Sequence, residues 1–256
     1  MKTVKKLELQ AIYVMWLRQM KRYIRSRSRL VTSFIQPLFF LVILGAGFRN
    51  IDIPGMVGPF LNFFAPGIIA MSILFSSMFT GVSLLWDKQF GFLQEVLVAP
   101  ISRISIIIGR TLGGATTALI QGFIILFIAI AMGVPINGIS GLLLALIFMI
   151  LTAFTAVGFG LIIASKMQDF HGFPLIMNLI FMPLLFLSSA FFPVSADPTL
   201  KTIAHFNPLF YMVDGLRGSL IGTSNIYHPL INLGIVAVIC IIMMFIGSYL
   251  FSKSEA

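Results

Sequence analysis

The feature that most constrains this chain is a succession of six long apolar segments that carry almost no charge. A helix needs about 20 mostly apolar residues to cross the roughly 30 Å hydrocarbon core of a bilayer. Only 10% of the residues are Asp, Glu, Lys or Arg, against about 25% in an ordinary soluble domain. A water-soluble globule is therefore excluded. The sequence predicts one all-α integral membrane domain over residues 1–256, with six transmembrane helices at about 30–48, 60–85, 104–132, 139–164, 174–193 and 230–251.

The few charged residues are unevenly distributed. The chain has 17 Lys and Arg against 8 Asp and Glu, a formal net charge of +9. In a soluble protein this excess would indicate a nucleic-acid partner, but in a membrane protein basic residues mark the cytoplasmic side. All but three of them lie on one predicted side. The sequence thus predicts a multi-pass cell-membrane protein with both termini in the cytoplasm and no nucleic-acid partner; the three exceptions are Arg49, Lys201 and Arg217.

Residues 1–29 have the pattern of an amphipathic helix lying in the interface of the membrane. Spacing of 100° per residue places an aromatic-rich apolar face opposite a basic face. Two interpretations stay open: the helix anchors the chain at the membrane surface, or it frames a docking surface for a partner subunit. The apolar face holds Leu9, Ile12, Tyr13, Trp16, Met20 and Tyr23, and the basic face holds Arg18, Lys21, Arg22, Arg25 and Arg29.

The connection 86–103 is the main predicted cytoplasmic segment. It mixes charged residues with apolar ones, and Pro100 ends any helix there because proline disfavours helical geometry in the residue before it. The pattern predicts a short amphipathic helix whose apolar face is covered either by a partner or by the bundle itself. The candidate docking residues are Asp87, Lys88, Phe90, Phe92, Leu93, Glu95, Pro100 and Arg103.

The segment 194–229 is too polar for a seventh span and is expected to form short helices at the outer membrane surface. Asp197–Pro198 and Asn207–Pro208 each join a capping side chain to a proline suited to the first helical turn. Gly222 is expected to end the second of these helices. Within it, Asp214 and Arg217 are three residues apart, so they share a helix face and are expected to pair.

The predicted spans contain almost no ionisable residue; Arg110, near the inner end of the third, is the exception. Ion-coupled transporters place charges at membrane depth, so the energy for transport is expected to come from another subunit. The spans do carry hydroxyl groups and a kinking proline, which either line an amphipathic substrate path or serve helix packing. These candidates are Ser76, Ser77, Thr80, Asn178, Pro183, Ser188 and Ser189.

Catalytic and metal-binding patterns are not found in this sequence. It has no P-loop, no zinc-protease histidine pair and no G-x-S-x-G turn, and its single cysteine, Cys240, forms no metal motif. The chain is therefore expected not to be an enzyme and to hold no metal or cofactor. A small intramembrane enzyme that uses His171 or His205 stays open as an alternative.

Two groups of residues resemble a known family. The run from Glu95 to Arg103, followed by Gly109–Arg110, resembles the region after the second span of ABC-2 type exporter permeases. The outer segment resembles the same family before its last span. The likeness is to the membrane subunits of daunorubicin-resistance-type drug exporters and nodulation-factor exporters. The outer residues that carry it are Phe192, Pro193, Asn207, Pro208, Tyr211, Asp214 and Arg217.

The resemblance implies a half-transporter. Two permease subunits, alike or different, would form the pathway, and separate ATPase subunits would bind ATP and Mg²⁺. Residues 87–98 would be the coupling helix, and 165–173 a second ATPase contact. The implied activity is export of a drug or lipid-like molecule, that is, multidrug efflux. Alternatives are export of a polysaccharide or lipid-linked glycan, and a secondary transporter that needs no ATPase.

Overall fold

A computed structural model describes residues 2–48, 58–99, 101–169, 171–194, 197–222 and 226–254; within these ranges it describes only the backbone of residues 2–6, 28, 29, 32, 46, 93, 97 and 254. In that part of the chain the structure is helical and has no strand. The elements are α1 (Lys2–Arg25), α2 (Arg27–Phe39), the π-helical η1 (Phe40–Leu44), α3 (Gly45–Gly47), α4 (Phe60–Gln89), α5 (Phe92–Val98), α6 (Arg103–Ala131), α7 (Gly138–Lys166), α8 (Gly172–Phe186), α9 (Pro198–Ala204), α10 (Pro208–Ile221) and α11 (Pro229–Ser254).

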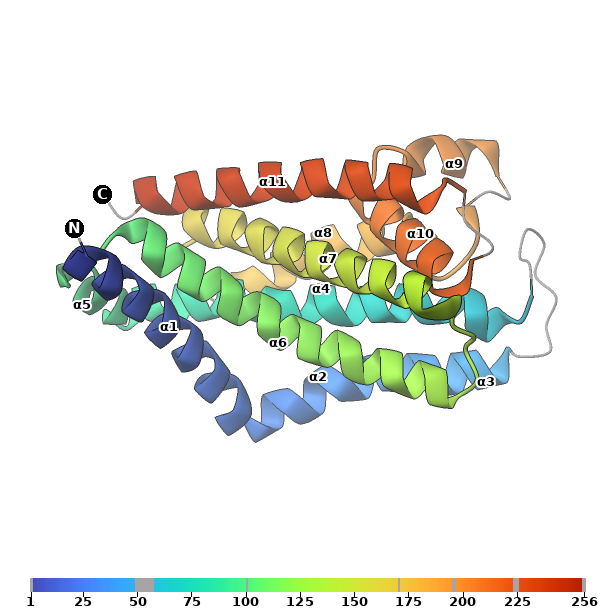
Figure 1. Ribbon diagram of the computed structural model, residues 1–256, viewed down its shortest axis with the longest axis horizontal. Coiled ribbons are helices and arrows are strands. Elements are labelled where there is room, and N and C mark those ends of the chain that lie inside the picture. Colours follow the sequence, from blue (N-terminus) through green and yellow to red (C-terminus); the bar gives the residue numbers. More distant parts are fainter. Residues whose placement is uncertain are drawn as a thin grey trace.

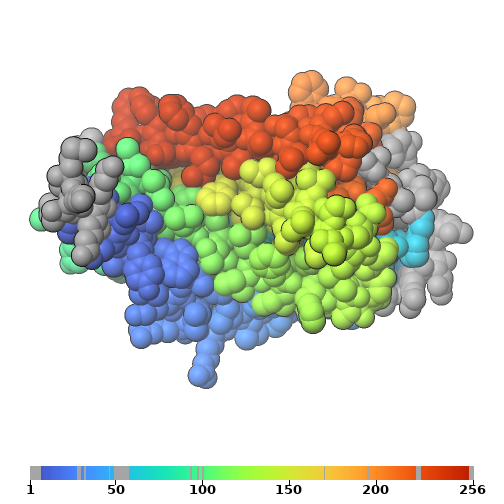
Figure 2. Space-filling view, in the orientation of Figure 1, coloured from blue at the N-terminus to red at the C-terminus, as the bar shows by residue number. Residues whose placement is uncertain are grey.

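The long helices run side by side around α4, the most deeply buried of them (Figure 1). α6 and α7 pack against α4, and α11 packs along α7. Both chain ends and α5 lie at one end of this bundle, called here the terminal end; α3, α9 and α10 lie at the other, the distal end. α11 forms a long outer edge of the molecule (Figure 2), and only 22% of its most apolar 18-residue stretch is buried. Such an apolar, uncovered helix fits contact with lipid or with another membrane subunit.

Four described helices are long and apolar enough to cross a membrane: α4, α6, α7 and α11. They match four of the six predicted spans. The first and fifth predicted spans contain shorter apolar helices, Ser33–Leu44 and Gly172–Phe186. α8 ends at Phe186, seven residues before the predicted boundary at 193, and the chain then turns rather than continuing as a helix. The expectation of a single long helix over 174–193 is therefore wrong.

The first predicted span is an interrupted helix. Helical structure follows the chain from Arg27 to Gly47 but widens to a π-helix at Phe40–Leu44. Pro37 lies one turn earlier, inside α2. Because proline lacks a backbone N–H, it breaks the regular i to i−4 hydrogen bonding, and the helix adjusts nearby.

Helix α1 packs along α6. Gly109 and Gly113 allow this approach: a Cβ at Gly109 would lie 2.7 Å from the Ile12 carbonyl oxygen, and one at Gly113 would lie 2.6 Å from Gln19 Cβ. Met15, Gln19 and Tyr23 are buried in the contact, while Leu9 and Tyr13 stay exposed. α1 is thus part of the bundle along one face and leaves another face uncovered.

The local signals for helix ends at the distal end are confirmed. The Asp197 carboxylate accepts hydrogen bonds from the backbone N–H groups of Thr199 and Leu200, and the Asn207 side-chain oxygen accepts one from Leu209. Gly222 ends α10 in the left-handed conformation, with φ of 77°, which glycine adopts without a steric penalty.

Candidate functional site at the terminal end of the bundle

The second connection is shorter than the sequence predicts, because α4 continues to Gln89. Asp87 and Lys88 therefore belong to the last turn of α4, and their assignment to the connection is wrong. Gly91 then turns the chain with φ of 75°, and the short helix α5 begins at Phe92 and ends at Val98. A short helix in this connection was expected, but its start lies five residues later than the predicted residue 87.

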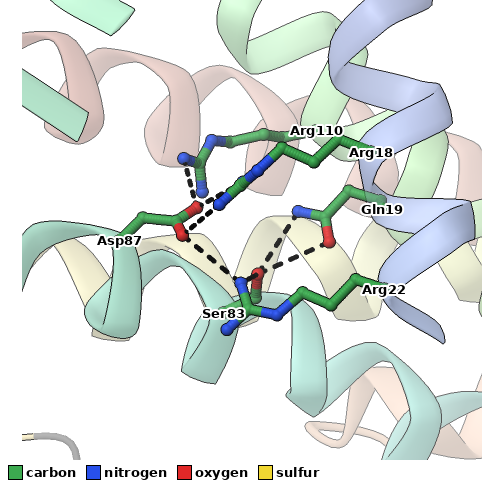
Figure 3. Close-up of polar contacts among 6 residues, drawn as sticks. All are labelled: Arg18, Gln19, Arg22, Ser83, Asp87 and Arg110. Atoms are coloured by element: carbon green, nitrogen blue, oxygen red, sulfur yellow. Dashed lines mark hydrogen bonds and ion pairs between the residues drawn. The ribbon is translucent and has the colours of Figure 1, made fainter. Parts of the chain in front are cut away.

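Asp87 is the centre of a cluster of ionic contacts (Figure 3). Arg18 of α1 holds its carboxylate in a bidentate pair, with N–O distances of 2.6 and 2.8 Å. Arg110 of α6 donates at 2.6 Å, and Arg22 of α1 donates at 3.3 Å. We call these four residues, with Gln19 and Ser83, the charge cluster. It joins three helices through one carboxylate that is only 4% exposed.

Polar side chains extend the charge cluster along α1 and α4. Ser83 lies one turn before Asp87 and accepts a hydrogen bond from Arg22 at 2.9 Å. The Gln19 side-chain amide nitrogen lies 3.4 Å from the Ser83 hydroxyl oxygen. One more turn along α4, Thr80 lines a small hollow with Ser76 and the buried Tyr23. α4 thus turns a polar stripe toward α1 and α6.

Arg18 also contacts α5 directly. Its guanidinium lies over the ring of Phe92, 3.7 Å from the ring centroid, a distance at which the cation is attracted to the aromatic face. Phe92 is the first residue of α5. One side chain therefore touches α5, the end of α4 and, through Asp87, α6.

Two further contacts fix the other end of the connection. The Glu8 carboxylate of α1 accepts hydrogen bonds from Ser102, from the hydroxyl at 2.8 Å and the backbone N–H at 3.0 Å. Hydrogen bonds from the Ser105 and Ser102 side chains lower the pKa of Glu8 below 4.5, because they favour the charged form. Arg103 donates to the Ser252 carbonyl oxygen at 2.8 Å, which joins the start of α6 to the end of α11.

The remaining predicted coupling residues differ in their surroundings. Phe90 is 67% exposed, and Glu95 is exposed on α5. Lys88 is half-buried at the end of α4. The Leu93 side chain and Pro100 lie outside the described residues. The terminal end thus presents an exposed aromatic ring and a carboxylate next to a buried ionic cluster, and their coupling role stays a prediction.

The predicted outer-segment residues form a second polar group at the distal end. Arg217 donates to the Phe63 carbonyl oxygen at 3.1 Å and to that of Ser189 at 2.5 Å, and it lies 3.8 Å from the centroid of the Phe63 ring. Asp214 accepts from the backbone N–H groups of Ile226 and Tyr227 and from Asn232. The expected ion pair between Asp214 and Arg217 is not formed; backbone groups bind each of them instead. Both are buried.

Other outer-segment residues tie neighbouring elements together. The Asn207 side-chain N–H donates to the Leu184 carbonyl oxygen of α8 at 2.6 Å, and the Tyr211 hydroxyl donates to the His205 carbonyl oxygen at 2.9 Å. Pro193 is buried, whereas Phe192 is partly exposed. We call Ser189, Asn207, Asp214 and Arg217 the distal cluster. These contacts hold the short distal helices against α4, α8 and α11.

The candidate substrate-path residues do not gather on one surface. Ser76 and Thr80 face the hollow beside Tyr23, and the Ser77 hydroxyl bonds to the Ile73 carbonyl oxygen. Asn178 and Pro183 lie on the exposed face of α8. Ser188 and Ser189 are buried, and Ser189 belongs to the distal cluster. Their role in a path stays a prediction.

The charge cluster was missed by the sequence interpretation, which placed Arg18 and Arg22 on the basic face of an interfacial helix and Asp87 in the connection 86–103. Arg18 and Asp87 are 69 positions apart, so no local spacing connects them. A signal was nevertheless present: Asp87 is the only acidic residue between Asp52 and Glu95. A lone carboxylate at the end of an apolar span requires a cationic partner.

The fold defines a class of protein: a multi-pass helical membrane protein that carries a short amphipathic helix at the end of the bundle where both termini lie. The family model of the ABC-2 type transporter matches residues 10–221. The chain belongs to this family of transport permeases, the membrane components of transporters that generally work with an ABC ATPase.

Several curated relatives resemble the chain along most of its length. The putative transport permease ycf38 of Cyanophora paradoxa is 28% identical over 257 residues, which cover 96% of this chain and 89% of the relative. The inner membrane transport permease YadH of Escherichia coli is 27% identical over 92% of both chains. Nodulation protein J of Rhizobium leguminosarum is 26% identical over 91% of this chain and 90% of its own length.

Proposed function

We propose that this chain is the permease subunit of an ATP-driven exporter for a hydrophobic or amphipathic substrate, a drug or a lipid-like molecule. A separate ABC ATPase would bind at the terminal end, and a second permease subunit would complete the pathway. The observation that carries the proposal is the direct contact of α5 with the charge cluster through Arg18 and Phe92. Force applied to α5 would reach α1, α4 and α6 through Asp87.

We also propose six crossings with both termini in the cytoplasm. Both termini lie at one end of the bundle (Figure 1), as an even number of crossings requires. A 15-residue helix such as α8 is about 22 Å long, too short to cross alone. Residues 187–194 would complete that crossing, and Ser188, Ser189 and Ala190 are buried in protein there. Irregular backbone is tolerated at membrane depth in such a position.

The test is reconstitution of the chain with its ATPase subunit in vesicles, followed by measurement of ATP-dependent substrate export. Charge reversal by Glu95→Lys is the informative variant, because Glu95 is exposed on α5. We expect weaker ATPase binding and reduced export. Lys201→Glu is the matched control, since Lys201 is exposed on α9 at the distal end. Unchanged ATPase binding and export with Glu95→Lys would contradict the coupling assignment, and export driven by an ion gradient without the ATPase would contradict the class of transporter.

Export of a polysaccharide or lipid-linked glycan by the same architecture is the second candidate. We include glycan export in the test because the chain is similar to nodulation protein J, a relative along most of its length. Competition between a labelled drug and a lipid-linked oligosaccharide in the vesicle assay would separate the two substrates.

A further inference from the structure

The charge cluster contains more positive than negative charge. Three guanidinium groups surround one carboxylate. Arg110 is 1% exposed, and its Nε and Nη1 atoms have no hydrogen-bond partner among the described residues. The nearest acidic residues along α1 and α5 do not compensate, because Glu8 binds Ser102 and Glu95 is exposed. Partly buried positive charge without a counter-charge is costly, so an anion at this place would stabilise the cluster.

A groove lies on the same side of α1. It is an open hollow of about 610 Å³, lined by residues of α1 and by the adjoining Ser26. Positions 14, 18, 21 and 25 are four and three residues apart, so they share one face of the helix. The cationic lining residues are Arg18, Lys21, Arg22 and Arg25, and the apolar ones are Val14 and Leu17.

A second hollow adjoins the first. It has a volume of about 290 Å³ and is lined by Arg18, Arg22 and Asp87 together with the aromatic residues Trp86, Phe90 and Phe92. Arg18 and Arg22 thus contribute to both hollows. Trp86 is 38% exposed and Phe90 is 67% exposed. Exposed aromatic rings beside guanidinium groups are typical of the membrane interface, where apolar acyl chains meet polar headgroups.

We propose that this groove binds the headgroup of an anionic phospholipid. Arginine fits phosphate oxygens through paired N–H donors, and lysine adds charge. The apolar lining beside the cations would contact the start of the acyl chains. A lipid rather than free phosphate is the occupant, because a free anion would leave the apolar side chains of Val14 and Leu17, which line the same groove, in contact with water. The bound headgroup would balance the excess charge of the cluster that holds α5. This site concerns a resident lipid and does not depend on which substrate is exported.

The experiment is lipid titration of the full-length purified chain, with bound lipid counted by native mass spectrometry. Phosphatidylglycerol and phosphatidylcholine with identical acyl chains are compared. The double variant Lys21→Gln with Arg25→Gln removes two cations from the groove, and both side chains are exposed in the structure. The matched control, Lys166→Gln with Lys253→Gln, removes the same charge from exposed positions at the ends of α7 and α11.

We expect the wild type to prefer phosphatidylglycerol and the groove variant to bind it roughly tenfold more weakly, a loss of about 1.4 kcal/mol. The control variant should keep the wild-type affinity. Equal binding of the two lipids, or equal losses in both variants, would overturn the proposal. Displacement of the lipid by inorganic phosphate at equal concentration would overturn the assignment to a lipid. Circular dichroism of each variant confirms that the helices are intact before lipid is added.

Discussion

The two polar clusters of this bundle use buried charge in different ways. In the distal cluster, backbone carbonyl and N–H groups bind Arg217 and Asp214. In the charge cluster at the terminal end, side chains on three helices share the Asp87 carboxylate, and Arg18 and Arg22 are each 27% exposed. Backbone partners fix a group to one element, whereas side-chain ion pairs can exchange. The distal cluster is therefore suited to holding the fold, and the charge cluster to changing its arrangement when α5 moves.

The largest expected effect is on the distal cluster. Asp214→Ala would leave the N–H groups of Ile226 and Tyr227 and the side chain of Asn232 without their acceptor, and Arg217 without a nearby negative charge. Removing one member of such a buried group costs about 3–5 kcal/mol, so we expect loss of folded protein. Unfolding in detergent, followed by circular dichroism, measures this cost. Lys201→Ala, at an exposed position of the same end, is the control and should behave as wild type.

The next largest effect is expected at Asp87. Asp87→Asn would leave three guanidinium groups without a counter-charge and should cost about 2–3 kcal/mol, less than the distal change because solvent reaches Arg18 and Arg22. Adding Arg22→Gln should restore part of the stability, since it lowers the excess positive charge. The same unfolding assay measures both variants. Arg22→Gln is also measured alone. If the free energy of unfolding lost by the double variant equals the sum of the two single losses, excess positive charge does not cause the instability, and the described difference between the clusters is contradicted.

A smaller effect on folding, but a clear one on function, is expected for Arg18→Lys. Lysine keeps the positive charge but loses the bidentate pair with Asp87 and the flat stacking on Phe92. We expect the ATPase subunit still to bind, while substrate-stimulated ATP hydrolysis falls several-fold. Lys21→Arg, a reciprocal change one turn away on the exposed face, is the matched control. Full stimulation in the Arg18→Lys protein would show that this contact does not transmit movement.

The smallest effect concerns the contact between Glu8 and Ser102. Because hydrogen bonds lower the pKa of Glu8, its contribution is present above the unfolded pKa of about 4.5 and is lost as the pH falls through the lower folded value. Hydrogen exchange of residues 101–106 should be slower in the wild type than in Glu8→Gln at pH 7. The two proteins should converge in acid, at a pH below the lowered pKa of Glu8. A difference that is the same at both pH values would contradict this assignment.

Local sequence signals predicted the long helices and the caps well. Apolar length identified α4, α6, α7 and α11, and Asp197, Asn207 and Gly222 marked helix ends, because these features depend on neighbouring residues. The end of α8 was missed because apolar residues continue past Phe186, and composition alone does not distinguish a helix from a buried turn. The partners of Asp214 were also missed. A spacing of three residues permits an ion pair with Arg217, but backbone N–H groups bind Asp214 and backbone carbonyl oxygens bind Arg217.

The candidate site was only partly predictable. The presence of a short helix in this connection was predicted, since its mixture of charged and apolar residues is local, but its start was placed too early. The contacts of Asp87 with Arg18 and Arg110 depend on how α1 and α6 pack, and no periodicity in one sequence specifies that. Glycines such as Gly109 and Gly113 permit a close helix contact, but the sequence does not specify that α1 makes it.

The most direct test of the account is a pair of distance measurements on the complex with its ATPase. Spin labels would be placed at the terminal end, on Val98 and Lys253, and at the distal end, on Ile139 and Phe206, all exposed positions; Cys240→Ser removes the native thiol. Distances are compared between the nucleotide-free and the ATP-trapped states. The account predicts that the terminal pair shifts by several ångström while the distal pair keeps its distance. A distal shift as large as the terminal one, or no terminal shift, would contradict it.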